Sequence, residues 1–147
     1  MIDIEPLRFA WTPGGANTLV LGRLHVAHGQ TVFLHGPSGC GKSTLLGLLA
    51  GVLLPNQGRV CLLGQDWAAL KPGQRDAFRA DHVGVIFQQF NLLPYLSVLD
   101  NVTLPCRFSS VRRERCQAAG GPEAVAQNWL QRMGLPQALW MLSLIHI

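Results

Sequence analysis

The sequence feature that most constrains this chain is a glycine-rich stretch, residues 36–44, with the sequence GPSGCGKST. It fits G-x-x-x-x-G-K-[ST], the phosphate-binding pattern known as Walker A. Glycines let the backbone curl so that several N–H groups point at one anion, and a helix that follows directly adds the positive end of its dipole. The pattern therefore predicts a site for the phosphate groups of a nucleotide.

The residue types within this stretch predict separate roles. Lys42 would place a full positive charge beside the β- and γ-phosphates, and Ser43 would offer Mg²⁺ a hydroxyl ligand. The alternative is a glycine-rich turn that binds nothing, although a chance match in a chain this long has a probability on the order of one percent. The predicted phosphate-binding residues are Gly36, Pro37, Ser38, Gly39, Cys40, Gly41, Lys42, Ser43 and Thr44.

The segments around the loop favour an α/β fold. Residues 31–35 are predicted to form a short buried strand that leads into the loop, and residues 44–50 an apolar helix that leaves it. Strands that alternate with helices indicate a sheet whose ligand lies at the carboxyl ends of its strands. Further strands are expected within residues 2–9 and at 19–21, 24–26, 59–63 and 83–87, of which the last is fully apolar.

Three helices are predicted after the loop helix. The first covers residues 72–80, and the second covers 97–104, opened by a capping box from Ser97 to Asp100 and ended by Pro105. The third covers residues 122–133. One face of it carries Val125, Trp129, Leu130 and Met133, a spacing that indicates packing rather than a binding site.

The chain has 147 residues, enough for one domain with a core, and a net charge of +4. Hydrophobic residues make up 48% and charged residues 14%, which excludes a disordered chain. The basic residues are mostly scattered. Their one cluster, residues 112–115 (RRER), contains an acid and is predicted to be a solvated helix face. No nucleic-acid partner is therefore expected.

The cysteines and the apolar runs bear on the compartment. Cys40, Cys61, Cys106 and Cys116 form no C-x-x-C pair, so reduced thiols are expected. The acidic start of the chain lacks the basic and apolar regions of a signal peptide. The longest apolar run, residues 45–54, falls well short of the about 20 residues that span a bilayer. Any membrane role is thus expected to depend on a partner.

A second stretch, together with Walker A, carries a family resemblance. Residues 83–94 (VGVIFQQFNLLP), followed by residues 97–102 (SVLDNV), resemble the Q-loop region of the nucleotide-binding subunits of ABC transporters. The resemblance covers roughly residues 5–140. The residues at 91–94 and 101–105 are most similar to the branch that releases lipoproteins and exports macrolides.

The resemblance implies a fold and a function. The expected architecture is a P-loop NTPase core with an N-terminal antiparallel β subdomain and part of a helical subdomain, incomplete in this chain. Residues 1–140 would be the N-terminal part of an ATP-binding domain that binds ATP and Mg²⁺. The implied partners are a membrane-spanning transporter subunit and a second ATP-binding subunit, in a homodimer. The implied location is the cytoplasm, at the inner face of the cell membrane.

Two further residues receive roles from the resemblance. Trp11 stands where the family places an aromatic ring on adenine, whereas spacing alone favours a core tryptophan. Gln88 stands where the family places a Mg²⁺ ligand that also positions the attacking water, beside the contact with the membrane subunit. Without the resemblance, Gln88 is only a polar residue at the end of a strand.

Several family motifs do not occur in the sequence. There is no LSGGQ-type signature, no apolar strand ending in Asp-Glu, and no histidine at the switch position. The chain as given is therefore expected to lack its catalytic glutamate, to bind nucleotide weakly and not to hydrolyse it. Residues 141–147 resemble a non-native tail. Without the apolar strand that ends in Asp-Glu, one edge of the central sheet would be unpaired. Exposed sheet edges promote aggregation, so poor solubility is expected.

Three other classes stay open at this point. A non-transport ABC ATPase acting on DNA or ribosomes would share the Walker A loop, as would an inactive nucleotide-binding remnant. An unrelated P-loop kinase or GTPase would share it too, but would not need the residues around Gln88. The transported substrate is not encoded in these motifs, because in this family the membrane subunit mostly selects it.

Overall fold

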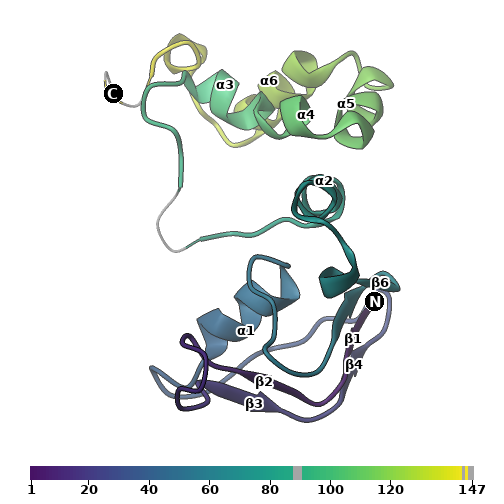
Figure 1. Ribbon diagram of the computed structural model, residues 1–147. Helices are drawn as coiled ribbons and strands as arrows, with labels where there is room; N and C mark the ends of the chain where they lie inside the picture. Colours follow the sequence, from purple (N-terminus) through teal and green to yellow (C-terminus); the bar gives the residue numbers. More distant parts are fainter. Residues whose placement is uncertain (88–90, 144, 146–147) are drawn as a thin grey trace. The chain divides into compact units, whose positions relative to one another are not determined.

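The computed structural model describes residues 1–87, 91–143 and 145. Contacts within the chain divide it into two compact units, Met1–Arg79 and Ala80–Ile147 (Figure 1). The first unit carries the strands and the glycine-rich loop, and the second is helical. Each unit is described by itself below.

Short antiparallel strands form two sheets in the first unit. The larger sheet has the order β4 (Leu24–Val26), β1 (Ile2–Ile4), β5 (Val60–Leu62) and β6 (Gln65–Asp66). The smaller sheet pairs β2 (Leu7–Phe9) with β3 (Leu19–Leu21). Pro6 separates β1 from β2, because proline has no N–H for the ladder. The predictions at 19–21, 24–26 and 59–63 are confirmed within a residue at each end.

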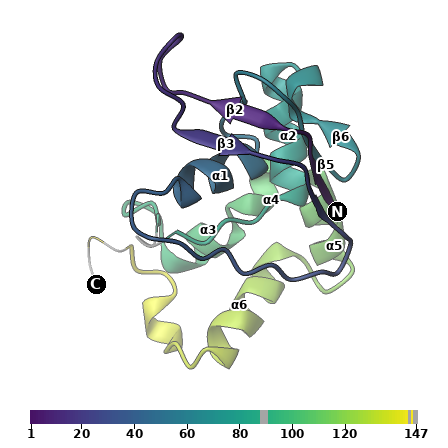
Figure 2. The ribbon, with the colours of Figure 1, turned by 90° about the horizontal axis from the view of Figure 1, so that it is seen from below.

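The core of the first unit lies between the strands and one helix. Helix α1 (Lys42–Leu49) buries Thr44, Leu45 and Leu48, three positions on one side of a 3.6-residue period. The 3₁₀ turn η1 (Trp67–Ala69) follows β6 in the chain, and the Asp66 side chain caps its start. Figure 2 shows α1 together with β2 and β3 in a second view. The most completely buried apolar side chains are those of Ile4, Leu7, Leu48, Val60 and Trp67.

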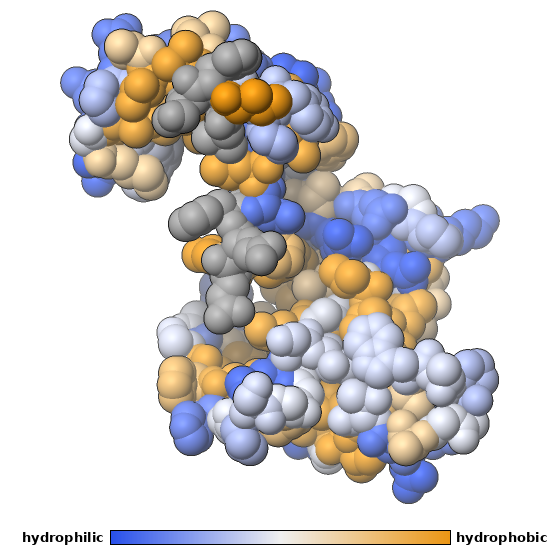
Figure 3. Space-filling view, turned by 90° about the vertical axis from the view of Figure 1, so that its left-hand side faces the viewer, coloured by the Kyte–Doolittle hydropathy of each residue, from blue (hydrophilic) through white to orange (hydrophobic). Residues whose placement is uncertain are grey.

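The expected strands at residues 31–35 and 83–87 are not present, and this expectation was wrong. Neither segment belongs to a ladder among the described residues, and their apolar side chains face outward: Phe33 is 87% exposed and Ile86 is 100% exposed. A strand exists only through its ladder partners, so an apolar run without them stays an extended segment. Apolar side chains, shown in orange, are visible among the polar ones on the surface in Figure 3.

Helices make up the regular structure of the second unit. The long helix α2 (Pro72–His82) runs across the division between the units and extends two residues beyond its prediction. Within the second unit, α3 packs against α6, and α4 packs against α5. Their bounds are α3 Val98–Thr103, α4 Pro105–Phe108, α5 Ser110–Gln117 and α6 Pro122–Arg132, followed by the 3₁₀ turn η2 Gln137–Leu139.

Helix α6 has the predicted position but not the predicted buried face. Ala126 and Leu130 are buried, whereas Trp129 is 49% exposed and Met133 is 76% exposed. The buried stripe is therefore a narrow i, i+4 pair. The exposed indole is covered instead by its neighbour one turn on, since the Arg132 guanidinium lies 4.8 Å from the Trp129 ring centroid.

The basic cluster in α5 is also only partly a solvated face. Arg112 is half-buried: its Nε donates to the Ala80 carbonyl at 2.6 Å, and its Nη2 donates to the Val83 carbonyl at 3.0 Å. Arg113 and Arg115 are exposed, as predicted. Arg112 thus donates hydrogen bonds to carbonyls at and just beyond the end of α2. Carbonyls at a helix end have no N–H partner within the helix.

Candidate nucleotide-binding site

The glycine-rich loop folds as an irregular turn that ends at the start of α1. Gly39 (φ 81°) and Gly41 (φ 94°) adopt left-handed backbone conformations, which favour glycine. A Cβ atom on Gly36 would lie 2.8 Å from the Cys40 Sγ, and one on Gly41 would lie 3.3 Å from the Leu19 Cδ1. The backbone thus favours glycine at Gly41, a position that the Walker A pattern specifies, and a Cβ at Gly36 would displace the Cys40 side chain.

Helix α1 begins without a capping side chain. Its N-cap is Gly41, no side chain accepts a hydrogen bond from the first turn, and no acidic residue lies there. The first N–H groups of a helix have no partner within the helix itself. Together with the positive end of the helix dipole, they form a place where an anion is stabilised.

Lys42 lies across the loop. Its Nζ donates to the carbonyl of Gly36 at 2.8 Å and to the carbonyl of Pro37 at 2.7 Å. The single positive charge of the loop is therefore held within the curl. Ser43 is exposed, so its hydroxyl can reach a metal ion, whereas Thr44 is buried at 8% exposure and contributes to packing.

The other end of α1 is held by a residue that sequence reasoning missed. Trp67 is fully buried, and its Nε1 donates to the Leu49 carbonyl at 3.2 Å. Gly51 (φ 67°) permits this approach, because a Cβ there would lie 2.6 Å from the Trp67 ring. Trp67 lies in a segment with neither helical nor strand periodicity, so the sequence offered no signal for its role.

The structure leaves Trp11 at the surface. The indole is 64% exposed and meets the ring of Phe9 edge-on, with ring centroids 5.1 Å apart. The core position that spacing alone favoured is therefore not what the structure shows. An exposed aromatic face is what stacking on a base requires. Gln88, the other residue that the resemblance singled out, lies outside the described residues.

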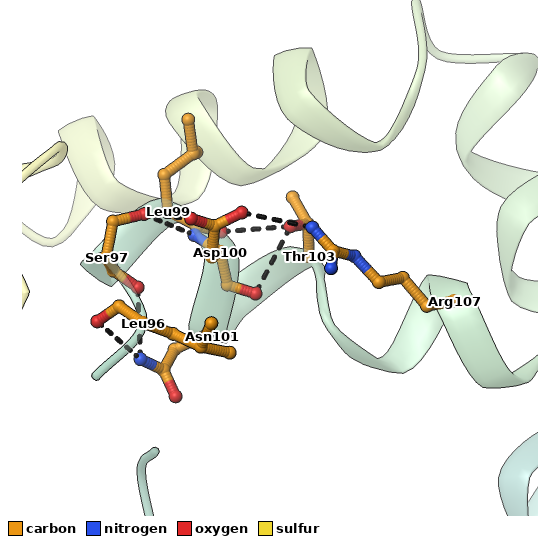
Figure 4. Close-up of polar contacts among 7 residues, drawn as sticks. All are labelled: Leu96, Ser97, Leu99, Asp100, Asn101, Thr103 and Arg107. Atoms are coloured by element: carbon orange, nitrogen blue, oxygen red, sulfur yellow. Dashed lines mark hydrogen bonds and ion pairs between the residues drawn. The ribbon is translucent and has the colours of Figure 1, made fainter. Parts of the chain in front are cut away.

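The segment that follows Gln88 is organised by a polar network in α3. Ser97 Oγ accepts from the Asp100 N–H at 3.0 Å, which confirms Ser97 as the N-cap of α3. The Asp100 carboxylate accepts from the Ser97 hydroxyl at 2.7 Å, whereas a complete capping box has it accept from the Ser97 N–H. Asn101, which the sequence did not single out, donates through Nδ2 to the carbonyls of Leu93, Leu96 and Ser97. Figure 4 shows these side chains turned back toward the start of the helix.

Residues just after η2 also meet the start of α3. The Val98 N–H donates to the Leu142 carbonyl at 3.1 Å, and the Leu99 N–H donates to the Trp140 carbonyl at 3.0 Å. Ser97 and Ser143 form an isolated antiparallel β-bridge. Pro105, predicted to end α3, also begins α4 as its first helical residue.

Comparison with known proteins decides the family. The family model described as ABC transporter matches residues 22–142, most of the chain. This chain belongs to the ABC transporter family. The matched range contains the Walker A loop, α1 and all the helices through η2.

The similar proteins include macrolide export proteins and uncharacterized ATP-binding proteins of ABC transporters. A macrolide export ATP-binding/permease protein, MacB, of Rhodopirellula baltica is 41% identical, over 78% of this chain and 17% of its own length. An uncharacterized ABC transporter ATP-binding protein of Methanocaldococcus jannaschii is 37% identical, over 80% of this chain and 55% of its own. The chain thus spans about half or less of the length of these relatives.

A solved structure supports the fold class. A dimeric ATP-binding cassette, MJ0796, in a post-hydrolysis state bound to ADP and Pi, aligns with 100% of this chain and 63% of its own, with a TM-score of 0.81 and 27% identity. The predicted class, an α/β P-loop ATPase core with an antiparallel β subdomain and part of a helical subdomain, is confirmed. The relatives named above are described as ATP-binding proteins.

Proposed function

We propose that the chain binds ATP with Mg²⁺ at the glycine-rich loop and, within its whole protein, powers export or lipoprotein release through a membrane-spanning partner. The observation that supports binding is the loop itself. It ends at a helix start without a side-chain cap, and it holds the ammonium of Lys42 against the Gly36 and Pro37 carbonyls. An anion in the loop would be met by N–H donors and by that charge.

The residue roles follow from these positions. Residues Gly36 to Thr44 would hold the phosphates through their N–H groups, except Pro37, which has none. Lys42 would leave its two carbonyl acceptors to contact the β- and γ-phosphates. The exposed hydroxyl of Ser43 would bind Mg²⁺, with Gln88 as a second ligand. Trp11 would stack on adenine through its exposed ring.

The partners are proposed from the relatives. The printed name of the Rhodopirellula relative combines an ATP-binding part with a permease, and the MJ0796 cassette is dimeric. We infer that this chain, in its whole protein, pairs with a second ATP-binding subunit at the cytoplasmic face of a membrane subunit. No helix among the described residues is long and apolar enough to cross a bilayer. On its own the chain is expected to bind ATP without turnover, because the sequence lacks the family's catalytic glutamate.

Equilibrium binding tests this function directly. A fluorescent ATP analogue is titrated into the purified chain with Mg²⁺, and the bound fraction is measured by anisotropy, with ATP as competitor. Saturable binding that ATP displaces and EDTA weakens supports the proposal. Absence of binding by chain that melts cooperatively contradicts it. Binding to nucleic acid with a steep salt dependence would point to the class that acts on DNA or ribosomes.

A further inference from the structure

Two cysteines of the second unit lie in contact. Cys106 is in α4 and Cys116 is in the last turn of α5, and their Sγ atoms are 3.8 Å apart. Both are free thiols, and both are half-buried, so that each keeps some access to solvent. The contact comes from the reversal of the chain between the two helices, not from a local sequence motif.

That reversal is anchored at its centre. Ser109 is buried at 1% exposure; its Oγ donates to Asp81 Oδ1 at 2.6 Å and accepts from the Arg112 N–H at 3.0 Å. Arg112 then reaches the Ala80 and Val83 carbonyls. These bonds hold the turn and the start of α5 against the end of α2, and α4 packs against α5. The contact between the two thiols is therefore a product of the fold.

We propose that Cys106 and Cys116 are a redox modification site that closes to an intramolecular disulfide by exchange with a small aliphatic disulfide. The sulfurs must approach from 3.8 Å to the about 2.05 Å of a disulfide bond. The proposal requires rotation about the Cα–Cβ bonds of the two cysteines to supply this movement. The two cysteines belong to the second unit and the nucleotide loop to the first, and the proposal does not depend on the proposed function.

The exchange balances as two displacement steps. One cysteine thiolate attacks a sulfur of the small disulfide, forms a mixed disulfide and releases one small thiol. The other cysteine thiolate then attacks the protein sulfur of that mixed disulfide, forms the Cys106–Cys116 bond and releases the second small thiol. The two protein thiols lose two electrons and two protons, and the small disulfide gains both.

The surroundings of Cys106 slow its reaction at neutral pH. Burial, and then the hydrogen bond with Cys116, raises the pKa of the Cys106 thiol above its ordinary value. Because the thiolate is the nucleophile, the exchange is expected to become faster as the pH rises.

Peptide mapping tests the site. The full chain is equilibrated with oxidised and reduced glutathione, quenched with acid, alkylated with N-ethylmaleimide and cut with trypsin. Arginines at 79, 107, 115 and 132 place Cys106 in peptide 80–107 and Cys116 in peptide 116–132. A disulfide joins these peptides into one mass that reductant separates.

The native chain is expected to yield this pair at least about tenfold above any other cysteine pairing. In urea the preference for the Cys106–Cys116 pair over any other pair should fall to about threefold. In an unfolded chain this is the advantage that loop-closure entropy gives to the two cysteines closest in sequence. A native preference no greater than that in urea overturns the proposal, as does recovery of both cysteines alkylated or separately glutathionylated under native conditions.

Four variants sharpen the test. Cys106→Ser and Cys116→Ser should each remove the joined peptide mass and leave the remaining thiol of the pair alkylated or glutathionylated. Cys61→Ser, the matched control, should leave the yield of the pair unchanged. Ser109→Ala removes the anchor of the turn and should lower the native preference. An unchanged preference in that variant would contradict the role given to the turn.

Discussion

Helices α1 and α3 begin in opposite ways. The start of α1 has a glycine N-cap with φ 94°, no side-chain acceptor and no acid in its first turn. The start of α3 has the hydroxyl of Ser97 on the Asp100 N–H, and the Asp100 carboxylate beside it. The first helix start has no side-chain acceptor for its N–H donors, and the second has one within its own first turn.

The difference teaches how one physical need is met in two ways. Every helix start leaves N–H groups without intrahelical partners, and a short polar side chain usually caps them. At α3 this capping residue, Ser97, is part of the local sequence. At α1 it is absent, and Lys42 adds a positive charge where an N-terminal acid would otherwise be favourable. A site of this kind is stable only if other contacts hold the helix in position.

The largest expected effect comes from removing such a contact. Trp67→Ala should destabilise the first unit by about 3–5 kcal/mol, because it leaves a cavity and frees the Leu49 carbonyl. Urea unfolding followed by circular dichroism measures the change. Trp129→Ala, which truncates a half-exposed indole, is the control and should cost much less. Similar losses in both variants would contradict the view that Trp67 supports α1.

Lys42→Met should weaken ATP binding by about ten- to a hundredfold, since charge-assisted hydrogen bonds contribute about 1.5–3 kcal/mol. Competition with a fluorescent ATP analogue gives the ratio. Lys71→Met, which removes an exposed charge outside the loop, should leave the affinity nearly unchanged. An unchanged affinity in the Lys42 variant would show that the start of α1 is not the phosphate site.

Gly41→Ala should destabilise the loop by about 1–2 kcal/mol, because alanine disfavours the left-handed conformation and its Cβ would press on Leu19. The free energy of unfolding and the ATP affinity should both fall. Gly73→Ala is the matched control, since nothing lies within 4 Å of its added Cβ and its φ is not positive. It should be neutral or slightly stabilising.

Ser97→Ala should cost about 1 kcal/mol of stability in the second unit without changing ATP affinity. Ser97→Thr keeps the hydroxyl and should retain most of that stability. Thermal unfolding and nucleotide titration of the same preparations separate the two effects. A loss of ATP affinity in the alanine variant, with its unfolding temperature unchanged, would contradict the view that the start of α3 stabilises the fold and has no part in binding.

Sequence reasoning succeeded where the signal is local. The glycine positions, the N-cap at Ser97 and the proline and glycine that bound α6 depend on neighbours a few residues apart. It was wrong for residues 31–35 and 83–87, because composition shows that a segment suits a strand but not whether another strand pairs with it. It also overstated the packing of Trp129 and Met133, which share a helix with the buried residues but not their burial.

The sequence by itself determined the glycine loop, the helix that follows it and the family, because each depends on residue types at fixed spacing. Only the tertiary structure decided that Trp67 supports α1, that Arg112 serves the end of α2, and that Cys106 meets Cys116. These contacts join residues from different elements, and no local pattern records them. Burial and chain reversal are properties of the whole packing, so they appear only when the elements are assembled.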